Sequence, residues 1–265
     1  MTPDDALAWA AAVPGTTGIF SDFDGTLSAI VRVPEDARPV AGAVGALVRL
    51  AEQFAVVAVV SGRPVSFLVA QLGLKGPGRL HAYGLHGVEH STGAEVDLAP
   101  GAADWRSAVA GVTTRRAELE AVGVSVEDKT HGVTLHWRRA TDPAAAEAAA
   151  MAAVDGAAAT GLIPRPGKAS VELVPPVGVD KGTVVLDWVR REGLRRVVFL
   201  GDDVSDVLAF DAIDTAVAEA GLQGLKLGVA GHEAPSLLVE RADILLASPE
   251  EAAGWLSQLA SRLER

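Results

Sequence analysis

The chain has no cysteine, one tyrosine and two methionines among its 265 residues. Without cysteine it has neither a disulfide framework nor a thiolate zinc site, which excludes a disulfide-stapled secreted module. Long hydrophobic runs are also lacking, because runs such as residues 54–60 (FAVVAVV) have the length of a strand and are too short to cross a bilayer. Basic residues are few, 23 against 34 acidic ones, so the net charge is −11. That balance disfavours binding to DNA, RNA or an anionic membrane.

The chain is rich in apolar residues, which make up 49% of it, and its charges are mixed rather than grouped in blocks. This composition disfavours disorder, and the length suits one large domain, or one domain with an insert, around a sizeable core. Residues 1–5 (MTPDD) are acidic where a signal peptide needs a basic segment. We therefore expect a soluble cytoplasmic protein.

Two outer parts of the chain have the rhythm of a parallel α/β sheet. Apolar, β-branched runs at residues 17–23, 54–63 and 196–200 alternate with helical stripes. The middle differs, because residues 124–128 and 133–138 alternate in polarity around a turn and an alanine-rich helix follows, which predicts an antiparallel hairpin within a small α+β insert. We predict a core from residues 1–100 and 177–265, with the insert as a separate domain at 101–176.

Polar residues stand in four groups near the carboxyl ends of predicted core strands, where ligands bind in open α/β sheets. The first group is residues 22–26 (DFDGT). Asp22 and Asp24 are two positions apart, and Asp24 follows the strand, so its side chain can lie over Asp22. Carboxylates this close repel each other unless a cation lies between them, and Mg²⁺ suits such oxygen ligands. An ordinary capped turn explains the same five residues equally well.

The second and third groups are weaker signals by themselves. In residues 61–63 (SGR) the hydroxyl of Ser61 and the N–H groups of a strand-to-helix turn suit a phosphoryl oxygen, although a simple helix cap explains the segment better on its own. Lys181 begins a predicted helix. A lone lysine is usually a solvated surface residue, but here it would neutralise charge shared by a carboxylate and a phosphoryl group.

The fourth group, residues 201–206 (GDDVSD), has three carboxylates in five positions after a buried strand. Asp202, Asp203 and Asp206 would repel one another unless they hold a metal directly or through water. A surface loop explains any one of these residues but explains the set less well.

Taken in order, the four groups resemble the haloacid-dehalogenase-like superfamily of phosphohydrolases. The resemblance implies a parallel-sheet Rossmannoid α/β core with an inserted small α+β cap domain of the C2 type. It implies that Asp22 is the nucleophile, which forms an aspartyl-phosphate, and that Asp24 is the general acid and base. Ser61 and Lys181 would hold the phosphoryl group. These roles suit phosphate monoesters, whose slow hydrolysis requires in-line positioning and charge neutralisation.

The same resemblance implies a Mg²⁺ cofactor. Its ligands would be the carboxylates of Asp22 and Asp202 and the carbonyl oxygen of Asp24. Asp203 and Asp206 would then lie next to these ligands and support them.

The predicted hairpin carries charged residues on one face. Glu127 and Lys129 share a side of the first strand if it extends through the turn, and Thr134, His136 and Arg138 alternate with apolar residues on the second. Such a face offers the donors and acceptors that a polyhydroxylated ligand needs. On patterning alone, a solvated face with cross-strand ion pairs is the better interpretation.

Four strings resemble the trehalose-6-phosphate phosphatase family: residues 127–129 (EDK), 136–138 (HWR), 167–172 (GKASVE) and 83–87 (YGLHG). The resemblance extends over nearly the whole chain and implies that the substrate is bound by Arg63, His86, Glu127, Lys129, Arg138, Lys168 and Glu172. The chain departs from the family pattern at Leu85, Trp137, Ser205 and Val207, where the family usually has Asn, Tyr, Thr and an acidic residue. Leu85 and Val207 remove polar groups, so they bear on the identity of the sugar more than on the chemistry.

We therefore expect a Mg²⁺-dependent phosphomonoester hydrolase, a monomer whose partner is a small sugar phosphate, foremost trehalose 6-phosphate. Sucrose phosphate, a glycosyl-phosphoglycerate or another disaccharide phosphate are alternative substrates, and a non-catalytic sugar-phosphate sensor is an alternative function. A phosphoacceptor signalling module is disfavoured, since such modules are about half this length, have no insert and place the acceptor Asp on a later strand than the acidic pair. The sequence leaves the rate and the regulation open.

Overall fold

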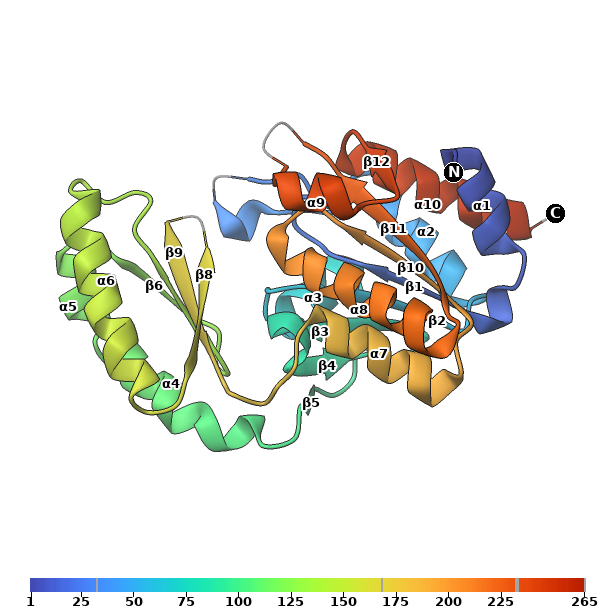
Figure 1. Ribbon diagram of the computed structural model, residues 1–265. Coiled ribbons are helices and arrows are strands. Elements are labelled where there is room, and N and C mark those ends of the chain that lie inside the picture. Colours follow the sequence, from blue (N-terminus) through green and yellow to red (C-terminus); the bar gives the residue numbers. More distant parts are fainter. Residues whose placement is uncertain (32, 168, 232–233, 265) are drawn as a thin grey trace. The chain divides into compact units, whose positions relative to one another are not determined.

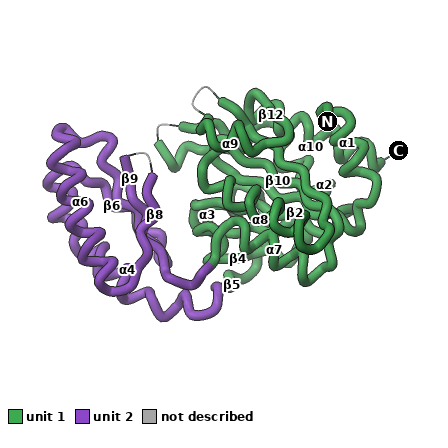
Figure 2. Tube along the Cα trace, viewed as in Figure 1, with its two compact units in different colours: residues 1–97, 179–265 green, residues 98–178 purple. Residues whose placement is uncertain are grey.

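The computed structural model describes residues 1–31, 33–167, 169–231 and 234–264. They divide into two compact units, with unit 1 formed by Met1–Asp97 and Val179–Arg265 and unit 2 by Leu98–Gly178 (Figure 2). Unit 1 therefore combines both ends of the chain, whereas unit 2 is one continuous segment. Over the described residues, no helix is both long and apolar enough to span a bilayer.

Unit 1 is built on a mostly parallel sheet (Figure 1). In the described part of the chain its strand order is β12-β11-β10-β1-β2-β3-β4-β5; the strands from β12 to β3 are parallel and β4 is antiparallel to β3. Both β1 and β2 are buried at every position, as parallel strands covered on both faces require. The strands are β1 (Thr17–Ser21), β2 (Val56–Val60), β3 (Leu80–Gly84), β4 (Glu89–Ser91), β5 (Asp97–Leu98), β10 (Arg196–Gly201), β11 (Gln223–Val229) and β12 (Ile244–Leu246).

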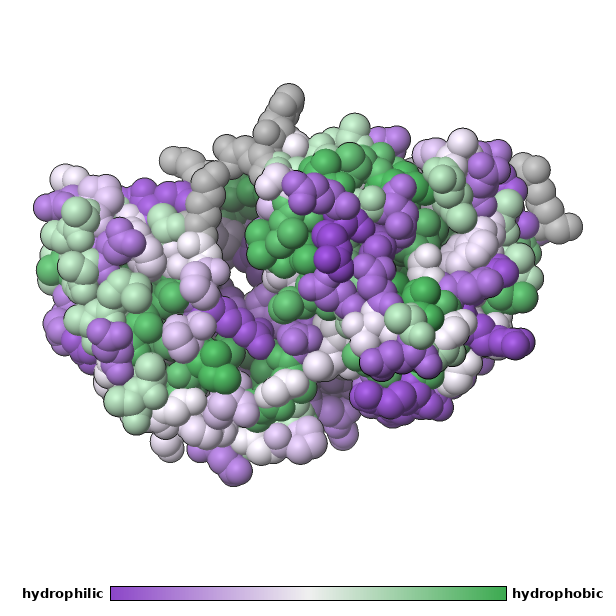
Figure 3. All heavy atoms as spheres, viewed as in Figure 1, coloured by the Kyte–Doolittle hydropathy of each residue, from purple (hydrophilic) through white to green (hydrophobic). Residues whose placement is uncertain are grey.

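Helices cover both faces of this sheet. Successive β-strand side chains point to opposite faces, so Ile19 joins the apolar core beneath α1, α2, α3 and α10, whereas Phe20 joins the core beneath α7 and α8. The solvent side of α7 is hydrophilic, along the lower edge of unit 1 (Figure 3). The helices are α1 (Pro3–Ala11), α2 (Ala43–Ala51), α3 (Val65–Leu72), α7 (Lys181–Glu192), α8 (Val204–Ala220), α9 (Ser236–Arg241) and α10 (Pro249–Leu263), with short 3₁₀ turns at Pro14–Thr16, Pro34–Asp36 and Leu85–Gly87.

Unit 2 has an antiparallel sheet with the order β6-β7-β9-β8 among its described residues. Val133 and Leu135 of β7 point into an apolar core that they share with the three α-helices of unit 2. Thr134 and His136, which alternate with them along the strand, therefore belong to the opposite, polar face. The elements are a 3₁₀ turn (Ala102–Trp105), α4 (Arg106–Thr113), α5 (Arg116–Ala121), β6 (Ser125–Asp128), β7 (Val133–His136), α6 (Pro143–Ala158), β8 (Ile163–Gly167) and β9 (Ser170–Val174).

The predicted fold class is confirmed, a parallel α/β core with a small α+β insertion. The predicted strand over residues 17–23 is shorter in the structure, because β1 ends at Ser21 and the chain turns at Gly25, where φ is +78°. The shortened strand therefore leaves residues 22–26 in a loop at the carboxyl end of β1.

Candidate active site

Asp22 and Asp202 lie at the carboxyl ends of two adjacent strands. β1 and β10 pair in parallel with Ser21 opposite Leu200, and the N–H of Asp22 donates to the carbonyl oxygen of Leu200 at 2.9 Å. Asp22 directly follows β1, and Asp202 directly follows β10. Strand pairing therefore brings together two carboxylates that are far apart in the sequence.

Lys181 is the cation of this group. It is the first residue of α7 and is only 1% exposed. It is therefore not the solvated surface lysine that the sequence analysis gave as the alternative. Its Nζ lies 2.9 Å from Oδ1 of Asp22 and 2.6 Å from Oδ1 of Asp206. Burial disfavours the charged ammonium, but the carboxylates of Asp206 and Asp22 outweigh it and raise the pKa of Lys181. The lysine therefore stays charged and neutralises part of the carboxylate charge.

Asp206 is fully buried and uses both of its carboxylate oxygens within the protein. Oδ1 accepts from Lys181, and Oδ2 accepts from the backbone N–H groups of Asp202 and Asp203 at 2.9 and 3.0 Å. These bonds fix the loop that follows β10. Asp206 thus positions Asp202 and Lys181.

Three carboxylates come close together here. One oxygen each from Asp22, Asp202 and Asp206 lies within 4.8 Å of the others. Burial, together with the neighbouring carboxylates, raises the pKa of Asp22 to about 7 against the opposing effect of Lys181, and raises that of Asp202 to about 9. A divalent cation would relieve this repulsion, and an all-oxygen donor set fits Mg²⁺. Asp22 and Asp202 are the carboxylates suited to hold it, because Asp206 is already engaged.

Gly25 makes this geometry possible. A Cβ atom at this position would lie 1.9 Å from Oδ2 of Asp202, and its φ of +78° is in the left-handed region. The next residue, Thr26, is buried and donates from Oγ1 to Oδ1 of Asp202 at 3.1 Å. The loop after β1 therefore packs directly on the carboxylate of Asp202.

Asp24 and Arg63 form an ion pair between the loops that follow β1 and β2. Nε and Nη2 of Arg63 donate to the two carboxylate oxygens of Asp24, each at 2.7 Å. Arg63 also lies over the ring of Phe67, 4.7 Å from its centroid. The segment that carries Arg63 begins with Ser61, which is 2% exposed and follows β2 directly.

His86 lies beside the same turn. The N–H of His86 donates to the carbonyl oxygen of Ser61 at 2.8 Å, and the N–H of Leu85 donates to that of Arg63 at 2.9 Å. A Cβ atom on Gly62 would lie 2.8 Å from Nε2 of His86. Both Leu85 and His86 have positive φ, 49° and 58°, a strained conformation that these backbone bonds hold in place. The side chain of Leu85 is fully buried.

Asp203 is separate from the group of three carboxylates. It is the N-cap of α8, is exposed, and accepts from the N–H of Val204 at 2.7 Å. Its neighbour Asp202 points toward Asp22 instead. The carboxylate therefore caps the helix, and its predicted role in supporting the metal ligands stays a prediction.

Of the predicted substrate-binding residues in unit 2, Glu127 and Glu172 lie on the polar face of its sheet, and Lys129 and Arg138 follow the ends of β6 and β7. Lys129 donates to Glu172 at 2.8 Å, and Nε2 of His136 hydrogen-bonds Oε2 of Glu127 at 3.0 Å. The side chains of Lys129 and Glu172 are only 9% and 11% exposed, so this pair is more buried than an ordinary solvated one. Arg138 is exposed after β7. The remaining predicted contact, Lys168, lies outside the described residues.

Strand register adds polar residues that the sequence analysis did not assign to the site. Glu127, Thr134, Glu172 and Arg165 lie opposite one another in one row across β6, β7, β9 and β8. The alternation on β7 already indicated the face of Thr134. Arg165 gave no such signal, because prolines flank it and disguise its strand.

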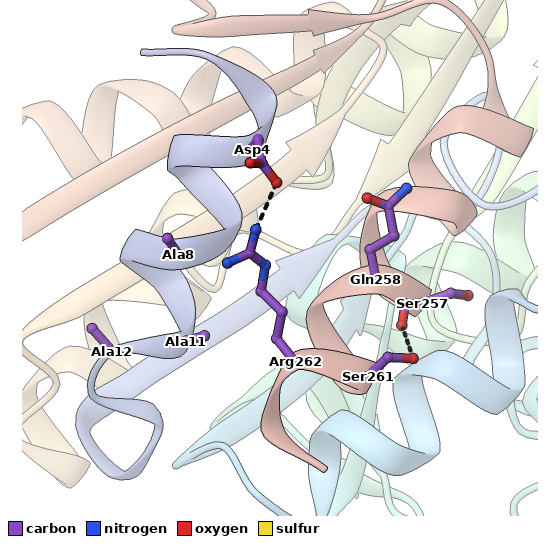
Figure 4. Close-up of a pocket in the computed structure, with 8 residues that line it drawn as sticks. All are labelled: Asp4, Ala8, Ala11, Ala12, Ser257, Gln258, Ser261 and Arg262. Carbon is purple, nitrogen blue, oxygen red and sulfur yellow. Dashed lines mark hydrogen bonds and ion pairs between the residues drawn. The ribbon is translucent and has the colours of Figure 1, made fainter. Parts of the chain in front are cut away.

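The cavity drawn in Figure 4 lies elsewhere in unit 1. It has a volume of about 700 Å³ between α1 and α10. The ion pair of Asp4 with Arg262, at 2.6 Å, crosses it, and small residues such as Ala8 and Ser261 line it. None of the predicted site residues is among its lining residues.

The chain is similar to known proteins over most of its length. The family model described as trehalose-phosphatase matches residues 20–232. Trehalose-phosphate phosphatases of Mycolicibacterium paratuberculosis and Mycobacterium avium are each 36% identical to the chain over 277 residues, covering 99% of the chain and 68% of each relative. The structure of the C. albicans trehalose-6-phosphate phosphatase C-terminal domain is similar, with a TM-score of 0.76, 22% identity and coverage of 98% of this chain and 97% of that one. The chain thus shares the fold of that structure.

Proposed function

Because the chain belongs to the trehalose-phosphatase family, we propose that it hydrolyses trehalose 6-phosphate to trehalose and inorganic phosphate with Mg²⁺ as cofactor. One observation carries the chemistry. Asp22 lies at the end of β1, in contact with the buried ammonium of Lys181 and close to the carboxylate of Asp202. A carboxylate held between a fixed cation and a cation site suits attack on a dianionic phosphoryl group.

The reaction has two steps, which replace one slow hydrolysis. An oxygen of Asp22 attacks the phosphorus atom to form an aspartyl-phosphate, while Asp24 gives a proton to the leaving sugar oxygen. Asp24 then removes a proton from a water molecule, which attacks the same phosphorus atom. Phosphate leaves and the carboxylate of Asp22 is restored.

Other residues of unit 1 would bind the phosphoryl group. Lys181 and the hydroxyl of Ser61 would neutralise and orient its oxygens. Mg²⁺, held by Asp22, Asp202 and the carbonyl oxygen of Asp24, would add charge neutralisation at the same oxygens. Arg63 fixes the carboxylate of Asp24 through its two hydrogen bonds, which suits a group that must give and take a proton in place.

Unit 2 would bind the sugar. Its polar face presents acceptors and donors in Glu127, Glu172 and Lys129, and trehalose hydroxyls can exchange with the partners that these side chains have now. The family resemblance extends this set to His86, Arg138 and Lys168. We further propose that the enzyme is cytoplasmic and that it is a monomer. Size-exclusion chromatography with light scattering would test the oligomeric state.

The first experiment measures phosphate release from trehalose 6-phosphate, sucrose 6-phosphate, glucose 6-phosphate and glucosyl-3-phosphoglycerate, with Mg²⁺ or with EDTA. We expect a Mg²⁺-dependent preference for trehalose 6-phosphate. A preference for another member would keep the chemistry and reject the substrate. No release from any member would favour the sugar-phosphate sensor.

A matched pair of variants tests the nucleophile. Asp22→Asn should lower kcat by about a thousand-fold or more. Asp203→Asn should retain most activity, because Asp203 is an exposed N-cap and asparagine caps helices equally well. Undiminished hydrolysis by Asp22→Asn would refute the covalent mechanism.

A further inference from the structure

Thr134 has a buried hydroxyl without a hydrogen bond. It lies within β7, is 5% exposed, and among the described residues its Oγ1 is the one buried side-chain polar atom that has no partner. Buried polar atoms in proteins are almost always hydrogen-bonded, so each exception needs an explanation.

The strand register places Thr134 in the middle of the polar face. Glu127 on β6 and Glu172 on β9 are both directly opposite it, and residues opposite each other on neighbouring strands share a face. Its neighbours in sequence, Val133 and Leu135, belong to the apolar core on the other face. Thr134 is therefore the central member of the row Glu127–Thr134–Glu172.

Both flanking carboxylates have partners other than Thr134. Glu172 accepts from Lys129 at 2.8 Å, and Glu127 is hydrogen-bonded to His136 at 3.0 Å. The hydroxyl lies between these two pairs and bonds to neither. A hydroxyl group donates and accepts, and a sugar hydroxyl does the same, so each could satisfy the other.

We propose that Thr134 is a specificity-determining residue whose hydroxyl hydrogen-bonds a hydroxyl group of the bound sugar. The inference rests on the proposed function, since it assigns one more contact to the same substrate. Sugar hydroxyls exchange with the partners of Glu172 and Glu127, and Thr134 then gains the hydrogen bond that it lacks. A site that offers a hydroxyl in this way selects substrates that present a matching hydroxyl.

Two variants test this role. Thr134→Val replaces the hydroxyl with a methyl group of similar size, and Thr134→Ser keeps the hydroxyl. Each is assayed with trehalose 6-phosphate and with p-nitrophenyl phosphate, a phosphomonoester without a sugar, and each is unfolded by heat. The readouts are the ratio of the two kcat/KM values and the Tm.

For Thr134→Val we expect the ratio of kcat/KM for trehalose 6-phosphate to that for p-nitrophenyl phosphate to fall about ten-fold. The loss should lie mainly in KM, and Thr134→Ser should restore the ratio. The Tm of Thr134→Val should equal or exceed that of the wild type, because valine removes a buried polar atom that has no partner. A hydroxyl with a purely structural role would give the opposite change in Tm.

Two results would overturn the inference alone: a Thr134→Val ratio within about two-fold of the wild type, or a lower Tm with equal losses on both substrates. Wild-type protein that hydrolyses p-nitrophenyl phosphate but no sugar phosphate would refute the proposed function, and the role of Thr134 with it. The two failures are therefore distinguishable.

Discussion

Arg63 holds Asp24 through two parallel hydrogen bonds, from Nε to Oδ2 and from Nη2 to Oδ1, both 2.7 Å long. Their side chains are 15% and 34% exposed, so the pair is partly shielded from water, and bidentate geometry fixes the plane of the carboxylate. The family resemblance implies that Arg63 binds substrate. In the structure Arg63 contacts Asp24, and we propose that it positions the acid and base; substrate binding by Arg63 stays a prediction.

Arg63→Lys should lower kcat/KM for the sugar phosphate by about 10- to 100-fold. Lysine keeps the charge but cannot make two parallel hydrogen bonds, so Asp24 loses its fixed orientation. Steady-state kinetics with saturating Mg²⁺ measure the loss. The matched control is Arg49→Lys, because Arg49 is 44% exposed and its contact to Glu264 is 3.6 Å long. If both variants retain wild-type kinetics, the orientation of Asp24 does not depend on the two hydrogen bonds from the guanidinium group of Arg63.

Lys181→Met should lower the free energy of unfolding by about 3 kcal/mol. It removes the cation of a buried ion pair, so the buried negative charge of Asp206 is no longer neutralised by the ammonium of Lys181. Phosphatase activity should fall by about a hundred-fold or more. Urea unfolding compares it with Lys226→Met. The ion-pair partners of Lys226, Asp214 and Asp243, are 41% and 42% exposed, so that change should cost about 1 kcal/mol or less. Equal losses of stability would contradict the buried pairing of Lys181.

Gly25→Ala should abolish most activity and lower the Tm. A Cβ atom there would lie 1.9 Å from Oδ2 of Asp202, and the φ of +78° adds strain. Gly73 is the matched control, because its φ is +66° but a Cβ atom would meet nothing within 4 Å. Gly73→Ala should therefore cost only about 1 kcal/mol of backbone strain and keep the activity. The comparison separates strain from collision with Asp202, and a fully active Gly25→Ala would exclude the collision.

The pattern of apolar runs predicted that Asp22 and Asp202 each follow a strand of the core sheet, and the family resemblance implied that the two meet. The local pattern alone did not predict which of these carboxylates point together; that assignment came from the family resemblance. Asp202 and Asp203 are consecutive, so their side chains leave the chain in different directions. One turns toward Asp22 and the other caps α8, a choice that depends on where the helix begins.

The partners of long side chains and the neighbours of residues on adjacent strands could not be predicted from the sequence either. The partner of Arg63 depends on how the loops after β1 and β2 approach each other, and no local pattern reports that distance. The row through Thr134 and Arg165 depends on the register of the unit 2 strands. One residue of slip would send the opposite set of side chains to the polar face.

Asp202→Asn should change how the stability of the metal-free protein depends on pH. Burial, followed by the charges of Asp22 and Asp206, raises the pKa of Asp202 from 3.8 to about 9. Between these two values the folded protein keeps a proton that the unfolded chain has lost, so the contribution of Asp202 to stability falls as pH rises. Asparagine does not titrate and can still accept from Thr26. In EDTA the Tm of the variant relative to the wild type should therefore increase from about pH 5 to pH 8.

At about pH 8, added Mg²⁺ should raise the Tm of the wild type above that of Asp202→Asn. The ion binds the ionised wild-type site and stabilises the folded state, while Asp202→Asn gains little. Asp203→Asn is the control, since this exposed carboxylate lies apart from the group of three, and it should follow the wild type with and without the ion. Differential scanning fluorimetry at three pH values, with EDTA and with Mg²⁺, gives all of these comparisons. An equal gain from Mg²⁺ in the wild type and in Asp202→Asn would place the cation elsewhere and remove Asp202 from the set of metal ligands.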